Sequence, residues 1–221
     1  MRLTSRTRAR RTALARRLRD DRGLTLIELL VSIVILGVIT VPLGDALITF
    51  FGSTGRTTNE LGVSHDAQIA ASYFAHDVQS LGRRDWTAPP YLLAQSVEVN
   101  VAAAGGLAPC GVAGTPDAVV RLLWDDPSVA QTPTLVRVAY VVRTVGTEKQ
   151  LHRIRCVGGA TPVSDLVLAH NVVSVDPVVC STSCTAAPAL PQTVTLTVHL
   201  RAPGSTDPVL DIVLTGQRRQ T

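Results

Sequence analysis

The sequence predicts an α+β fold in which a long N-terminal helix packs on an antiparallel β-rich globular domain. Residues 24–44 form an almost wholly apolar run, and apolar residues then recur at spacings of three and four as far as position 81. Beyond Gly82 the apolar period changes from about 3.6 to 2. We therefore expect a helix that spans a membrane in its first half and is amphipathic in its second, followed by a succession of strands.

The basic charge of the chain is concentrated ahead of the apolar run. Residues 1–23 contain nine Arg and two Asp, a net charge of +7, whereas the whole chain carries +4, so the remaining residues carry −3. Positive charge this close to a membrane span keeps that end in the cytoplasm, and the rest of the chain is then outside. Because the rest of the chain is acidic, its charge argues against nucleic acid as a partner.

The apolar run is long enough to cross a bilayer. Its 21 residues span about 30 Å at about 1.5 Å per residue. Glu28 lies inside it, and an ionisable residue in such a segment usually has a specific partner. A secretory signal peptide would be cut behind its apolar core at small residues, and no such site follows here. A signal anchor fits the length and the charge but gives Glu28 no role.

The junction between the basic and apolar segments carries a recognisable pattern. Gly23 stands directly before the apolar segment, and Glu28 is the fifth residue after it. This resembles the processing site of the type IV prepilins and type II secretion pseudopilins. The resemblance implies that prepilin peptidase cleaves after Gly23, that the new amine of Leu24 is N-methylated, and that Glu28 is an assembly contact. Leu24 departs from the commoner Phe or Met, and Pro42 lies near the end of the span.

The helix has two expected interruptions and a predicted stop. Pro42 removes a backbone donor and predicts a kink near the outer end. Residues 52–55, Gly-Ser-Thr-Gly, predict a bend or a stop between the transmembrane, filament-core helix 24–51 and its amphipathic continuation 52–82. Gly82 is the stop signal. The expected apolar stripe is Ala67, Ala70, Ala71, Phe74, Val78 and Leu81, and the residues placed on other faces are His65, Asp66, Gln68, Asp77 and Gln79.

Residues 83–221 have the pattern of a β-rich extracytoplasmic domain. Alternation over 135–145, a turn at 146–149 and a return over 150–157 predict an antiparallel hairpin. The other predicted strands are 96–101, 118–124, 165–175, 193–201 and 209–215. The loops that carry most of the Pro and Gly are 102–117, 125–134, 158–164 and 181–192.

The four cysteines all follow the span, in the part assigned to the outside. Cys110, Cys156, Cys180 and Cys184 therefore favour disulfides, for which three pairings exist. The preferred pairing joins Cys180 to Cys184 across a small loop and Cys110 to Cys156 between a long loop and a strand. A zinc site is the alternative, although the sequence has no Cys-x₂-Cys pair.

The sequence contains no motif that predicts an enzyme. Its five His occur singly, and Gly-x-Ser-x-Gly, His-Glu-x-x-His and phosphate-loop patterns are absent. A dispersed Ser/His/Asp set stays open, since its members need not be neighbours in sequence. Asp125-Asp126-Pro127 is typical of a turn, with a contribution to a calcium site as the alternative. We therefore predict no enzymatic activity, no cofactor and no metal.

The resemblance extends into the following domain. Residues 66–80 look like the helix after the span in J-type pseudopilins and W-type minor pilins, 138–153 like their central hairpin, and 214–219 like their C-terminal strand. It implies a minor subunit of a type IV pilus or type II secretion-like filament, in the tip or priming complex. The implied partners are the prepilin peptidase/N-methyltransferase, other pilin or pseudopilin subunits, the membrane and the inner-membrane assembly platform.

The implied location is a single-pass membrane protein with a cytoplasmic N-terminus, and after assembly a cell-surface or envelope filament. Three other functions stay open at this point. The chain could be a major pilin, or a tip adhesin or DNA-uptake minor pilin that uses the loops 102–117 and 181–192. It could also be a signal-anchored extracytoplasmic binding domain with no filament role.

Overall fold

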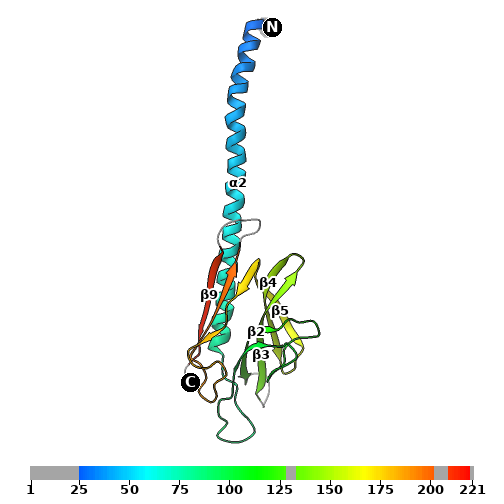
Figure 1. The fold of residues 1–221 in the computed structure, drawn as a ribbon, viewed down its shortest axis with the longest axis vertical. Helices are drawn as coiled ribbons and strands as arrows, with labels where there is room; N and C mark the ends of the chain where they lie inside the picture. The colour runs from blue at the N-terminus through cyan, green and yellow to red at the C-terminus, as the bar shows by residue number, and fades with distance from the viewer. Residues whose placement is uncertain (1–24, 128–132, 202–208, 220–221) are drawn as a thin grey trace, which may run out of the picture. The chain divides into compact units, whose positions relative to one another are not determined.

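A computed structural model of the chain describes residues 25–127, 133–201 and 209–219, with Arg56 described by its backbone alone (Figure 1). One helix, α2 (Leu26–Gln79), precedes a set of antiparallel strands, so the α+β prediction is confirmed. The chain divides into two compact units, Met1–Gly55 and Arg56–Thr221. The first contains the apolar half of α2, and the second contains the rest of α2 and both sheets.

The helix continues where the sequence predicted a bend or a stop. α2 runs through residues 52–55 without interruption. The hydroxyls of Ser53 and Thr54 donate to the carbonyl oxygen of Phe50, each at 2.9 Å, and so find partners within the helix. A glycine inside a helix costs only about 1 kcal/mol relative to Ala, which the continuous hydrogen bonds on either side outweigh. The helix ends at Gln79, close to the predicted stop at Gly82.

The first sheet is an antiparallel meander of five strands in chain order. Its strands are β1 (Val97–Val101), β2 (Ala118–Asp126), β3 (Thr134–Val145), β4 (Glu148–Val157) and β5 (Pro162–Ala169). The predicted hairpin is β3–β4, but its turn is tighter than expected. Val145 pairs with Glu148, which leaves only Gly146 and Thr147 between the strands. Gly146 has a φ of 62°, the left-handed conformation that a two-residue hairpin turn requires at its first position.

The second sheet is built around β8. Its strands are β6 (Val172–Val175), β7 (Val179–Cys180), β8 (Thr193–Leu200) and β9 (Leu210–Gln217). β6 and β7 pair with one edge of β8, and β9 pairs with the other, all antiparallel. Every second residue of β8 is buried, as its alternating sequence predicted.

The single strand predicted over 165–175 is wrong. It is two strands, β5 and β6, separated by His170 and Asn171, and they belong to different sheets. Asn171 has a φ of 52°, which breaks the extended backbone and turns the chain from one sheet to the other. β5 also begins at Pro162, inside the predicted loop 158–164, and proline is tolerated at the first position of a strand. The short strand β7 was not predicted.

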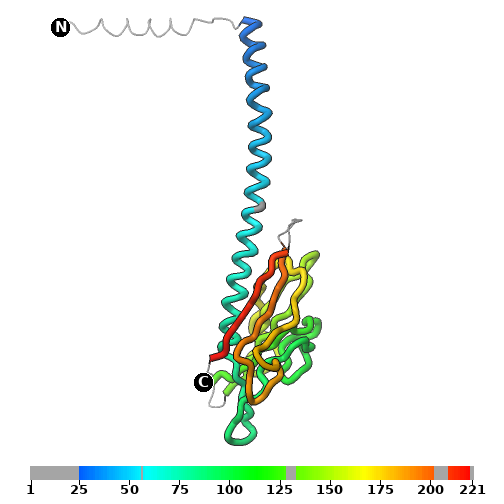
Figure 2. Tube along the Cα trace, turned by 60° about the vertical axis from the view of Figure 1, so that its left-hand side comes forward, coloured from blue at the N-terminus to red at the C-terminus, as the bar shows by residue number. Residues whose placement is uncertain are grey.

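The main core lies between the second half of α2 and the two sheets. Phe74 and Val78 of the helix are fully buried with Tyr140 of β3 and Leu196 of β8. Figure 2 shows β9 running beside the helix. Gly216 makes this approach possible, because a Cβ built at that position would lie 2.3 Å from the Cβ of Val78.

A smaller cluster lies on the opposite face of the first sheet. Its buried members are Cys110, Ala118, Ala139, Val141, Ile154 and Cys156. A disulfide between Cys110 and Cys156 joins the loop 102–117 to β4, and a second disulfide joins Cys180 to Cys184. These are the two pairs preferred from the sequence. The loop is thus part of the fold.

Candidate assembly site

The apolar segment begins with a capped helix end. The Thr25 hydroxyl accepts a hydrogen bond from the backbone N–H of Glu28 at 3.3 Å, which satisfies one of the free donors of the first turn. Glu28 thus stands in the first turn of α2, where a carboxylate also interacts favourably with the helix dipole. Its side chain is exposed and has no partner among the described residues. Gly23 and Leu24 lie outside the described residues.

The first half of α2 is apolar all round and uncovered. Every Leu, Ile, Val and Phe from Leu26 to Phe51 is exposed. By length and composition α2 is able to cross a membrane, and none of its most apolar stretch is buried against the rest of the described chain. Such a surface is not stable in water, so it requires lipid or other apolar helices around it.

The hydroxyl groups of this segment find partners on the same helix. Ser32 donates to the carbonyl oxygen of Glu28 at 2.8 Å, Thr40 to that of Leu36 at 2.9 Å, and Thr49 to that of Asp45 at 2.9 Å. No hydroxyl in this group needs water, which suits an apolar environment. The hydroxyl groups of this segment are therefore compatible with a lipid environment.

A second carboxylate, which the sequence reasoning did not consider, lies within the exposed apolar half of α2. Asp45 is exposed and follows Gly44 directly. It lies 17 residues after Glu28, about 25 Å along a helix. The separation of the two acids is close to the hydrocarbon thickness of about 30 Å. The signal was an acid directly behind the apolar run.

The second half of α2 is held to the first sheet by a buried ion pair. Asp77 is fully buried, which corrects its predicted place on an outer face. Its Oδ1 accepts from Nη2 of Arg153 and its Oδ2 from Nε of Arg153, both at 2.7 Å. The Tyr140 hydroxyl donates to the same Oδ2 at 2.7 Å. Asp77 is inward because these donors from β3 and β4 replace water.

The surroundings shift the pKa of both donors in this cluster. Burial, together with the charge of Asp77, raises the pKa of Tyr140 well above its ordinary value, so its hydroxyl stays protonated and able to donate. Burial alone would lower the pKa of Arg153, but the hydrogen bonds and charge of Asp77 outweigh it and raise that pKa. The guanidinium also lies 5.0 Å from the ring centroid of Tyr73, one helical turn before Asp77.

A second polar contact fixes the helix eleven residues earlier. Oδ2 of Asp66 is 2.9 Å from both the backbone nitrogen and the ring Nδ1 of His170. His170 belongs to the break between β5 and β6. Asp66 and Asp77 therefore tie α2 to the sheets at two points along its second half.

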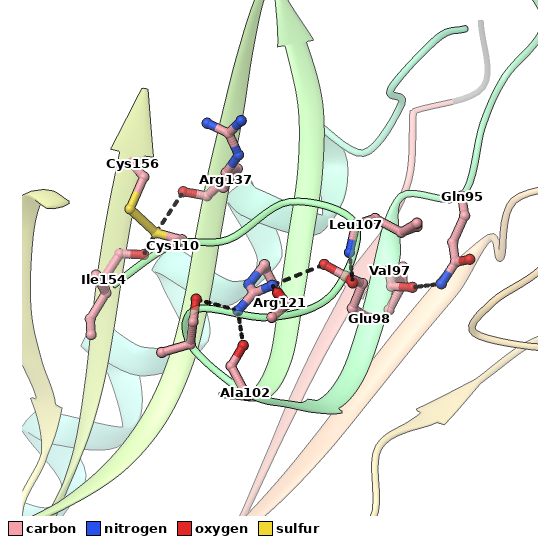
Figure 3. A network of polar contacts seen from close by, with 12 residues as sticks. Gln95, Val97, Glu98, Ala102, Leu107, Cys110, Arg121, Arg137, Ile154 and Cys156 are labelled. Atoms are coloured by element: carbon pink, nitrogen blue, oxygen red, sulfur yellow. Dashed lines mark hydrogen bonds and ion pairs between the residues drawn. A yellow bond between two sulfur atoms is a disulfide. The ribbon is translucent and has the colours of Figure 1, made fainter. Parts of the chain in front are cut away.

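The loop 102–117, which the sequence analysis considered as a ligand-binding loop, is held in place by buried polar contacts (Figure 3). Arg121 of β2 is fully buried, and its guanidinium donates to the carbonyl oxygens of Ala102 and Gly105, each at 2.9 Å. Glu98 of β1 lies 3.1 Å from the same guanidinium. Its other oxygen accepts from the backbone N–H of Leu107 at 2.6 Å. These contacts and the Cys110–Cys156 disulfide hold the loop between residues 102 and 110.

Three of the five histidines, His152, His170 and His199, hydrogen-bond to carboxylates at separate places in the fold. Nδ1 of His152 is 2.7 Å from Oδ1 of Asp165, while His199 lies between Asp211 at 2.6 Å and Asp176 at 2.9 Å. Within residues 25–127, 133–201 and 209–219, no group of three or more His, Cys, Asp or Glu is arranged to hold a metal ion. Asp125, the calcium alternative in the sequence, accepts hydrogen bonds from Arg84 and Trp86 instead.

Comparison with known proteins finds one family match, in the region where α2 begins. Residues 18–44 match the family described as the prokaryotic N-terminal methylation motif. This match supports a place for the chain in the type IV pilin and pseudopilin superfamily. No curated protein and no solved structure matches it.

The motif implies processing by prepilin peptidase and assembly with other pilin subunits. The superfamily consists of structural subunits rather than enzymes. The exposed apolar half of α2 is long and apolar enough to anchor such a subunit in a membrane.

Proposed function

We propose that this pilin is a minor subunit of a type IV pilus or type II secretion-like filament. Prepilin peptidase cleaves between Gly23 and Leu24, the Leu24 amine is methylated, and residues 24–51 enter the filament core. The observation that carries this proposal is an uncovered apolar helix whose first turn presents a carboxylate, Glu28, that has no partner among the described residues.

The role of Glu28 follows from the cost of its surroundings. A carboxylate among packed apolar helices is unfavourable unless a cation neutralises it. Cleavage after Gly23 creates an amine on Leu24, at the same end of the segment. We propose that the Glu28 carboxylate pairs with the Leu24 amine of a neighbouring subunit. This pair would then set the axial position of one helix relative to the next.

The remaining parts of the chain follow from this assignment. Residues 1–23 are a leader that stays cytoplasmic until it is removed, 24–51 anchor the subunit before assembly, 52–82 continue the helix, and 83–221 form the extracytoplasmic domain. The inner-membrane assembly platform then moves the subunit from the membrane into the filament.

The minor role and the J/W subtype are supported by pattern rather than by relatives. The helix over 66–80, the hairpin around 138–153 and the closing strand over 214–219 have the order expected of J-type pseudopilins and W-type minor pilins. Subunits of this type are placed at the tip or in the priming complex. Abundance in sheared filaments separates this role from that of a major pilin.

Mass spectrometry of the mature N-terminus tests the processing step. We expect a chain that begins with methylated Leu24, and a Gly23→Phe variant that keeps its full length. A wild-type protein that retains residues 1–23 at the cell envelope is a signal anchor, and the proposal then fails.

Filament incorporation tests the role of Glu28. A Glu28→Gln variant is expected to be cleaved and membrane-bound, yet to enter filaments at least tenfold less. Glu60→Gln, which changes an exposed Glu of the same helix outside the apolar segment, is the matched control and should assemble normally. Equal incorporation of both variants would rule out the pairing.

A further inference from the structure

The segment between α2 and β1 is a built loop with exposed aromatic residues. Two backbone hydrogen bonds cross it, from Ala94 N–H to the Arg83 carbonyl at 2.8 Å and from Asp85 N–H to the Leu92 carbonyl at 2.9 Å. Arg83 also donates its backbone N–H to the Ser96 hydroxyl at 2.9 Å. Figures 1 and 2 show this blue-green loop extending beyond the end of α2. We call residues 83–94 the aromatic loop.

Two rings in the aromatic loop lie against each other and are partly exposed to solvent. Trp86 and Tyr91 are 46% and 39% exposed, with ring centroids 5.2 Å apart and planes tilted by 37°. The indole N–H of Trp86 donates to Oδ2 of Asp125 at 2.9 Å, and the Arg84 backbone N–H donates to the same oxygen at 2.7 Å. The indole is therefore fixed in orientation by β2, and what it offers to a ligand is its apolar face.

The size of this surface argues against a protein partner. Trp86, Tyr91 and Leu92, the last 56% exposed, together expose about 300 Å². A stable protein–protein interface needs about 800 Å² on each partner. The neighbouring Ala88, Pro89 and Pro90 are exposed as well. A small, rigid ligand unit fits this surface better than a second protein.

The charges around the rings argue against a nucleic acid. Arg83 and Arg84 are matched by Asp85 and Asp125, so the surroundings have no excess of positive charge. Hydrogen bonds from the side chain and backbone of Thr87 lower the pKa of Asp85, which therefore stays ionised. Two carboxylates beside the rings would repel the phosphates of a single strand, whose binding depends on positive charge.

We propose that the aromatic loop is a binding site for neutral sugar units of a polysaccharide. The C–H face of a pyranose ring is flat and weakly apolar, and it stacks on the exposed face of Trp86 or Tyr91. The hydroxyls at the rim of the sugar then reach groups of both kinds. Arg84 donates, the Asp85 carboxylate accepts, and the Tyr91 hydroxyl does either. The site uses only side chains of this one chain.

Calorimetric titration of the purified full chain with sugars tests the proposal. The probes are hexamers of β-1,4-linked glucose, α-1,4-linked glucose and β-1,4-linked N-acetylglucosamine, and the detergent must lack a sugar headgroup, since such a headgroup would compete. We expect at least one hexamer to bind with millimolar or better affinity, to change the tryptophan fluorescence, and to be unaffected by 0.5 M salt.

Three alanine variants make the test specific. Trp86→Ala and Tyr91→Ala should each weaken binding at least tenfold. Tyr73→Ala is the matched control, because Tyr73 is the same residue type with the same 39% exposure on α2, and it should bind as the wild type does. Equal thermal midpoints for Trp86→Ala and the wild type exclude loss of folding as the cause.

Three outcomes would overturn the proposal. The first is no binding of any hexamer at 10 mM. The second is sugar binding that survives in both Trp86→Ala and Tyr91→Ala. The third is salt-sensitive binding of a thymidine 12-mer that these two variants lose, which would assign the loop to single-stranded nucleic acid.

Discussion

Removal of the Asp77 carboxylate is expected to destabilise the domain more than most single substitutions. Asp77→Ala leaves Arg153 buried without its carboxylate and the Tyr140 hydroxyl without its acceptor. Three hydrogen bonds of 2.7 Å are lost at once. Breaking one side of a buried ion pair costs about 3–5 kcal/mol, because the remaining charge is still desolvated. Individual contributions in such a cluster are not additive, so we expect a loss within that range.

Urea unfolding of the full chain in detergent, followed by circular dichroism and fluorescence, measures this loss. A change of 1 kcal/mol moves the thermal midpoint by about 2–4 °C in a domain of this size, so Asp77→Ala should melt about 6–20 °C lower. Asp117→Ala removes an exposed carboxylate and should stay within about 0.5 kcal/mol of wild type. Asp77→Asn, which keeps the shape, should be intermediate.

A double-mutant cycle decides whether the loss comes from the pair. Arg153→Met removes the buried charge, so adding it to Asp77→Ala should cost far less than it does alone, with a coupling free energy of about 2 kcal/mol or more. If the two losses simply add, or if Asp77→Ala costs under 1 kcal/mol, the ion pair does not hold the helix to the sheet and the reasoning fails.

Three further predictions concern other parts of the second unit. Hydrogen bonds to Asp176 and Asp211 raise the pKa of His199, so its stabilising contribution is complete below about pH 6.5 and is lost as the pH rises through the raised value. The thermal midpoints measured at pH 5.5 and pH 8.5 should therefore differ less for His199→Gln than for His65→Gln. Equal differences in the two variants would contradict this. Gly216→Ala should cost about 1–3 kcal/mol in urea unfolding through its clash with Val78, whereas Gly159→Ala, which meets nothing within 4 Å, should not. Replacing both Cys110 and Cys156, which are separated by 46 residues, with Ala should cost about 4 kcal/mol of stability. The same replacement of Cys180 and Cys184, separated by 4, should cost about 2 kcal/mol. If the second pair costs more than the first in the same assay, loop entropy does not govern the stabilisation by these disulfides.

The sequence was informative wherever one physical period governs a segment. The alternation of β8 and of the β3–β4 hairpin predicted both, and the spacing of Phe74 and Val78 predicted the buried stripe of α2. It failed where a local signal was weak. Asn171 was the one sign that the run 165–175 is two strands, and a residue that tolerates positive φ is easily passed over inside an apolar run.

The buried polar residues could not be predicted from periodicity for a different reason. An aspartate in an amphipathic helix is assigned to solvent by default, and the partner that brings Asp77 inward is 76 residues away. The local sign was its place three residues after Phe74 and four before Leu81, on the apolar stripe itself. Arg121 and Glu98 were missed likewise, since their buried pairing depends on how the loop 102–117 folds back over the sheet.

The two halves of α2 treat an acid in apolar surroundings in opposite ways, and the contrast bears on assembly. Asp77 is buried and fully paired within the chain, by Arg153 and Tyr140. Glu28 lies exposed in an apolar stretch of the helix, and the described residues offer its carboxylate no partner. An unpaired carboxylate is tolerable while that end of the segment lies at the membrane surface and becomes costly once apolar helices pack around it. The chain therefore supplies its own partners for Asp77, which it buries itself. Under our proposal, Glu28 is buried only in the filament, and a neighbouring subunit supplies its partner.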